Sequence, residues 1–84
     1  MRINFFTKES KLLTFYELDS NPFKVGEIIN LNIYNHERVI WSSVEEVHKS
    51  YKIENIEHYL TADYTKEIKR NIIHTVAIEL SELI

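Results

Sequence analysis

Apolar and polar residues alternate along most of this chain, a pattern that favours β-strands over helices. Ile3 and Phe5 alternate with Asn4, and the polar residues 8–11 separate them from a second alternating run over residues 12–18. These two runs predict a β-hairpin. Because apolar residues occur on both sides of the second run, we expect that strand to be covered on two faces or bent at a barrel corner.

A third strand follows a clear break in the pattern. Residues 19–22 read Asp-Ser-Asn-Pro, in which the first three side chains bond to nearby backbone and Pro22 removes a backbone donor. Gly26, the only glycine, lies where the chain needs a tight bend. Residues 28–34 then alternate again, which predicts a strand.

The middle of the chain carries a helix-start signal. Ser43 and Glu46 are spaced as in a capping box, where the hydroxyl caps the first turn and the carboxylate reaches back. Val47 and Tyr51 continue the apolar positions at helical spacing. We therefore predict one short helix near residues 43–50.

The last third admits two interpretations. Residues 51–60 read as a strand whose faces switch near Asn55, and residues 72–80 alternate in the same way. A C-terminal helix over residues 66–83 would also place its apolar residues on one stripe. The run 72–76 is rich in β-branched residues, which lose rotamer freedom in helices. We therefore predict two strands joined around residues 61–71.

These elements predict a mainly β fold in one domain, residues 1–84. The expected architecture is a small five-stranded barrel or curled antiparallel sheet, SH3-like or OB-like, with one short helix near 43–50. The alternative is an α+β fold, a three-stranded meander with a C-terminal helix 66–83. Eighty-four residues suffice for one hydrophobic core.

Composition and charge narrow the possible functions. The net charge is −3, from 10 basic and 13 acidic residues, and the densest basic cluster is Lys66, Lys69 and Arg70. Phosphate binding needs a concentrated positive surface, so charge disfavours nucleic acid as a partner. The chain has no cysteine, and no run of apolar residues is long enough to be a signal peptide or to cross a membrane. We expect a cytoplasmic protein that does not bind membranes.

Residues capable of catalysis are scattered. None of the four histidines forms an i, i+4 pair or an H-E-x-x-H motif, and one glycine does not make a phosphate-binding loop. If the last two strands are neighbours, His58 and His74 approach each other across the sheet. Ser43 is better explained as a helix cap. We expect no enzyme activity, no cofactor and no bound metal.

The aromatic residues divide into core and surface candidates. Phe5, Phe15 and Phe23 are expected in the core. Amphipathic rings beside polar residues often mark recognition surfaces, and the candidate partner-binding residues are Tyr34, Trp41, His58, Tyr59 and Tyr64. Trp41 fits the end of a barrel equally well.

The sequence therefore favours a small non-catalytic module that binds another protein or a second copy of itself. A barrel that binds single-stranded nucleic acid through its tyrosines and its basic cluster is the alternative, and a small histidine-dependent enzyme is the least favoured possibility.

Overall fold

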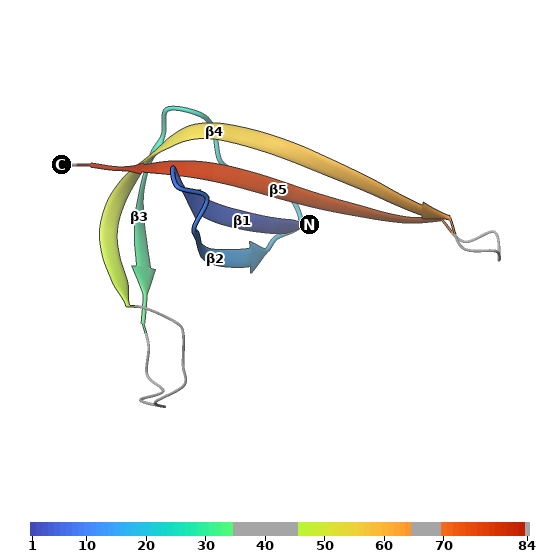
Figure 1. Ribbon diagram of the computed structural model, residues 1–84, viewed down its shortest axis with the longest axis horizontal. Coiled ribbons are helices and arrows are strands. Elements are labelled where there is room, and N and C mark those ends of the chain that lie inside the picture. The colour runs from blue at the N-terminus through green and yellow to red at the C-terminus, as the bar shows by residue number, and fades with distance from the viewer. Residues whose placement is uncertain (35–45, 65–69, 84) are drawn as a thin grey trace.

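The computed structural model is a single five-stranded sheet (Figure 1), and it describes residues 1–34, 46–64 and 70–83, without the side chains of residues 63–64 and 70–72. The strands are β1 (Arg2–Thr7), β2 (Leu12–Glu17), β3 (Ile28–Ile33), β4 (Val47–Tyr64) and β5 (Arg70–Glu82). Their order across the sheet is β2-β1-β5-β4-β3, and the sheet curls into a nearly closed, barrel-like shape. The prediction of a small, mainly β fold with five strands is confirmed.

The sheet is mixed, and the prediction of an antiparallel sheet is wrong at one pairing. β1 and β5 run parallel, from Arg2 opposite Thr75 to Thr7 opposite Leu80. The other three pairings are antiparallel. The reason is the connection after β2, which carries the chain from one edge of the sheet to the other. The chain then returns through two antiparallel pairings and meets β1 in the same direction.

Alternating residues of four strands form the core on the inner face of the curled sheet. Along β5 the buried residues are Val76, Ile78 and Leu80, the face that the sequence predicts. The other buried side chains come from β1, β3 and β4: Ile3, Phe5, Leu31, Tyr51 and Ile53. Fully burying a side chain of this size stabilises the fold by about 1.5–3 kcal/mol, so this cluster is the main source of stability.

The connection over residues 18–27 covers part of this core. Phe23 packs against the cluster, with its ring edge-on to Phe5 at a centroid distance of 5.3 Å. The Gly26 backbone N–H donates to the Ile53 carbonyl at 2.8 Å, and Gly26 has a φ of 92°. A positive φ is strained for residues with a Cβ, which explains glycine at this bend.

A β-bulge bends β4 into two halves. The register against β5 shifts between Ile53 and Asn55, where the sequence predicts that the faces switch. The extra residue, Glu54, accepts a 2.5 Å hydrogen bond from the Ser81 hydroxyl, which lowers the pKa of the Glu54 carboxyl. The first half of β4 lies beside β3 and the second half continues along β5 (Figure 1).

The two helical predictions are wrong where the structure describes the chain. Residues 47–50 belong to β4 and pair with residues 30–33 of β3, while residues 43–45 lie outside the described part. The alternative helix 66–83 is replaced from Arg70 onward by β5. A helix of two turns has little stability of its own, and pairing with a neighbouring strand supplies more hydrogen bonds and burial.

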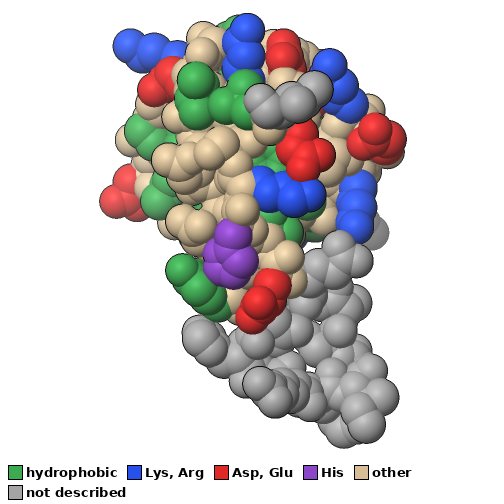
Figure 2. Space-filling model, turned by 90° about the vertical axis from the view of Figure 1, so that its left-hand side faces the viewer, with side chains coloured by type: hydrophobic (Ala, Val, Ile, Leu, Met, Phe, Trp, Pro, Cys, Tyr) green, Lys and Arg blue, Asp and Glu red, His purple; other side chains and the backbone are tan. Residues whose placement is uncertain are grey.

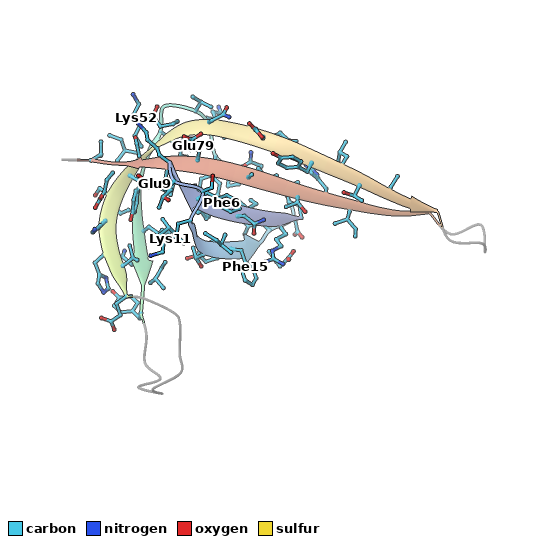
Figure 3. The ribbon with its side chains drawn as sticks, in the orientation of Figure 1. Phe6, Glu9, Lys11, Phe15, Lys52 and Glu79 are labelled. Carbon is cyan, nitrogen blue, oxygen red and sulfur yellow. The ribbon has the colours of Figure 1, made fainter. Side chains whose placement is uncertain are left out.

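The sequence predicts that β2 is either covered on both faces or bent, and in the described structure its outer face is uncovered. Phe15 is 48% exposed and points to the outer face at the edge of the sheet (Figure 3), where the Arg2 guanidinium lies 4.0 Å from its ring centroid. The prediction that Phe15 is in the core is therefore wrong, because a single curled sheet covers only its inner face and Phe15 lies on the outer one. The bend expected in this hairpin is present as a register shift between Phe5 and Phe6.

Candidate functional site

The five candidate partner-binding residues are spread along the sheet. Tyr34 directly follows β3, His58 and Tyr59 lie in the second half of β4, and Tyr64 is the last residue of β4. Trp41 lies outside the described residues, as does the side chain of Tyr64. As adjacent residues of one strand, His58 and Tyr59 face opposite sides of the sheet.

Tyr34 and Tyr59 lie at opposite ends of β4. The Tyr34 ring packs edge-on against His48, with ring centroids 4.7 Å apart. His48 and Tyr59 are separated by eleven positions of one strand, which is about 36 Å of chain at about 3.3 Å per residue. These two exposed tyrosines therefore do not share a surface patch.

His58 and His74 contact each other, as the sequence predicts for neighbouring strands. His58 is opposite Val76 and His74 is opposite Leu60, so the two histidines are diagonal neighbours on the inner face. The His58 Nδ1 and His74 Nε2 atoms are 2.9 Å apart, with ring centroids at 5.2 Å. This distance is that of a hydrogen bond, in which one ring nitrogen donates and the other accepts.

Beyond this pair, the β4–β5 hairpin continues as an arm, which we define as residues 60–64 and 70–74 (Figure 1). β1 pairs with β5 only from Thr75 onward, so the described arm has two strands and no third neighbour. The radius of gyration is 15.5 Å, against about 12 Å for a compact domain of this length. The arm extends beyond the compact body of the sheet.

Apolar side chains are exposed on both faces of the arm. Leu60, on the inner face, is 70% exposed, and Ile73, on the outer face, is 55% exposed. Tyr59 adjoins the arm on the outer face and is 52% exposed. An isolated two-stranded ribbon is marginally stable in water, and exposed apolar side chains on both faces do not improve its solubility.

Most of the arm and its base also lack charge, and Asp63 and Arg70 are the only charged residues of the arm. Residues 58–62 and 71–78 contain no Asp, Glu, Lys or Arg, although 27% of the chain is charged. Proteins commonly place charged residues on exposed strands to prevent pairing with other chains. The absence of charge over these residues leaves such contacts unopposed.

At the outer face, Glu57 organises a small polar cluster. Its carboxylate accepts a 2.5 Å hydrogen bond from the Tyr59 hydroxyl and a 3.1 Å bond from the Asn55 side-chain amide. The hydrogen bond to Glu57 raises the pKa of Tyr59, because ionisation would place two negative charges together. These residues line a shallow hollow of about 270 Å³ that also includes Phe6 and Glu79, which pair across β1 and β5 (Figure 3).

A larger hollow of about 410 Å³ lies on the other side of the turn that joins β1 and β2, and the two hollows share Thr7 and Lys8. Charged side chains of both signs surround it, with hydrophobic side chains visible between them (Figure 2). Its charged lining residues are Lys8, Glu9, Lys11, Lys49 and Glu82. Sequence reasoning missed this hollow, because its lining comes from segments far apart in the chain.

The charges around this hollow largely neutralise one another. Lys49 Nζ lies 2.6 Å from Glu82 Oε1, and the hydrogen bond to this carboxylate raises the pKa of Lys49. Tyr51 is buried at the floor, and burial raises the pKa of its phenol. Mixed charge at this density gives the hollow no clear preference for an anion or a cation.

Comparisons with protein-family models, curated proteins and solved structures found no match to this chain. Within the described ranges, no group of three or more His, Asp or Glu side chains is arranged to hold a metal ion. The described residues also contain no helix long and apolar enough to span a membrane.

Proposed function

We propose that this chain is a non-catalytic protein-interaction module that binds a second copy of itself through the arm. The observation that carries the proposal is the two-stranded extension of β4 and β5, which exposes Leu60 and Ile73 on opposite faces. The arm has the composition of a surface that another chain covers.

The described strand pairing supports this role. Within the body of the sheet, β5 lies between β1 and β4, so both of its backbone edges are paired. In the arm, residues 70–74 pair with β4 alone. The unpaired side of this segment is able to accept a strand from another chain, a common mode of protein recognition.

A second copy is the favoured occupant because most of the contacting surface carries no charge. Two identical charged arms would repel each other, whereas residues 58–62 and 71–78 contain no charged side chain. Identical apolar faces are also self-complementary in a two-fold arrangement. The net charge of −3 is small enough to permit association at physiological ionic strength.

The exposed side chains supply a useful part of the association energy. Complete burial of Leu or Ile contributes about 1.5–3 kcal/mol. With Leu60 70% exposed and Ile73 55% exposed on the opposite face, burying the remaining area contributes about 1–2 kcal/mol for Leu60 and about 1–1.5 kcal/mol for Ile73. Main-chain hydrogen bonds along the arm add to this contribution. The sum is offset in part by the entropy that two chains lose on association.

Sedimentation velocity across a concentration range tests the proposal. We expect the 84-residue chain to self-associate, and the Leu60→Lys and Ile73→Lys variants to associate at least tenfold more weakly, because each places a charge in the contact. Val25→Lys is the matched control. Val25 is 61% exposed and outside the arm, so this variant adds the same charge and should associate like the parent chain.

The concentration dependence decides between the outcomes. A parent chain that sediments as a monomer at every concentration would overturn self-association. A dimer that Leu60→Lys and Ile73→Lys weaken no more than Val25→Lys does would show that the arm is not the contact. Circular dichroism of each variant confirms that the lysine has not unfolded the chain.

A further inference from the structure

His58 and His74 are described histidines whose ring nitrogens face each other. Their facing nitrogens, Nδ1 of His58 and Nε2 of His74, are 2.9 Å apart. They come from adjacent strands that hydrogen bonds hold in register on both sides of the pair. The backbone register therefore places the two rings beside each other before any ligand arrives.

We propose that the His58–His74 pair binds one late first-row divalent metal ion, of the class Ni²⁺, Cu²⁺ or Zn²⁺, with water completing the coordination. The proposal rests on the geometry of the two imidazoles within one chain and does not require a second copy.

The nitrogen separation matches a bidentate site. Metal–nitrogen bonds to histidine are about 2.0–2.1 Å long, so two such bonds at about 90° place the nitrogens about 2.9 Å apart. A tetrahedral angle requires about 3.3 Å. The observed 2.9 Å therefore fits the right-angled arrangement of square-planar or octahedral Cu²⁺ and Ni²⁺. Zn²⁺ requires the rings to separate by about 0.4 Å.

The surroundings favour a nitrogen-binding metal over a hard cation. The strand neighbours of the pair on the inner face are Leu60 and Val76, which are apolar. Mg²⁺ and Ca²⁺ require several oxygen ligands, and the described residues contain no group of three or more metal-binding side chains here. Two neutral imidazoles without a carboxylate select the later transition metals.

The hydrogen bond between the two rings does not prevent them from binding a metal ion. In the hydrogen-bonded pair, one facing nitrogen carries a proton and the other accepts it. Metal binding needs both facing nitrogens deprotonated. The donor ring meets this requirement by carrying its proton on its other nitrogen, a change of tautomer that exchange with water allows.

Calorimetric titration of the 84-residue chain with NiCl₂ and with ZnCl₂, at low protein concentration, tests the site. We expect one metal ion per chain. The affinity should fall at least about tenfold in His58→Gln and in His74→Gln, because each variant removes one of the two nitrogen ligands. His48→Gln is the matched control. His48 is an exposed histidine on the same strand and contacts neither member of the pair, so its loss should leave the affinity within about twofold.

NMR spectra of the imidazoles locate the ion independently. Zn²⁺ should shift the ring signals of His58 and His74 together, and unchanged amide spectra of the two glutamine variants would show that they remain folded. MgCl₂ should shift neither ring. The proposal would be overturned if the parent chain bound Ni²⁺ no more tightly than the His58→Gln and His74→Gln chains, or if the metal shifted other histidines alone.

Discussion

Replacing Phe23 by alanine tests whether the connection over residues 18–27 helps to close the core or only links two edge strands. Phe23 is the aromatic side chain of this connection, and its ring lies edge-on against Phe5 with centroids 5.3 Å apart. The variant Phe23→Ala removes that ring and leaves the strand pairings intact. We expect a large loss of stability with little change in the sheet.

The magnitude follows from burial. Phe→Ala substitutions at fully buried sites cost about 3–5 kcal/mol. Phe23 is only partly buried, but its edge-on pairing adds about 0.5–1.5 kcal/mol, so we expect a loss of about 2–3 kcal/mol. A domain of this length has a total free energy of unfolding of about 4–13 kcal/mol. The variant therefore remains folded but becomes markedly less stable.

Urea unfolding followed by far-ultraviolet circular dichroism measures this loss. With an m-value near 1 kcal/mol/M, the lower end for small proteins, the midpoint should fall by about 2–3 M with an unchanged slope. Val25→Ala is the control, because Val25 belongs to the same connection but is 61% exposed, and its midpoint should change by less than about 0.5 M. Equal shifts for the two variants would refute the idea that this connection closes the core.

Three further predictions concern single groups. Gly26→Ala should cost about 1–2 kcal/mol, measured by the same urea unfolding, because φ is 92° at Gly26 while the space around an added Cβ is open. Burial raises the pKa of Tyr51 above its ordinary 10.0. The contribution of the Tyr51 phenol to stability is therefore complete below pH 10 and is lost as the pH rises through the higher pKa of the folded state. Tyr51→Phe should make the free energy of unfolding less dependent on pH in this range. The hydrogen bond to Glu57 also raises the pKa of Tyr59, so Glu57→Gln should lower it, as ultraviolet titration of the phenols would show, and a titration unchanged from that of the parent chain would contradict the assignment.

Local alternation predicted most of the strands because each strand has a buried inner face. Residues 72–80 alternate between inward Val76 and Ile78 and outward Ala77 and Glu79, as the structure shows. The switch of faces near Asn55 is present as a bulge, since one extra residue reverses the facing of every residue that follows. These features depend on the spacing of neighbouring residues, which a sequence displays directly.

The short helix was wrong because the local signal was ambiguous and a distant partner decided it. Val47 and Tyr51 are four residues apart, which suits one face of a helix and also one face of a strand. In the structure, Val47 pairs with Ile33 and Tyr51 with Ile29. Those pairings join segments that are far apart in the chain, so no window around residues 43–50 contains the information.

The candidate site was predicted only in part for a similar reason. The contact between His58 and His74 followed from assuming that the last two strands are neighbours, and that assumption is confirmed. The separation of Tyr34 from Tyr59 depends on the length and register of β4, which local alternation did not supply.

The arm exists because β5 is longer than its neighbour β1 and pairs with it only over part of its length. β5 has 13 residues and its neighbour β1 has six, and their pairing begins at Thr75, so all of the excess at the start of β5 projects beyond β1. The inner face of the β4–β5 pair includes Val76 and Leu60, yet Val76 is buried and Leu60 is 70% exposed. The same face thus forms the core in the body of the sheet and an uncovered surface in the arm. Since a sequence selected only for a stable monomer would gain solubility from charge in the uncovered part, the absence of charge from residues 58–62 and 71–78 argues for a partner that covers them.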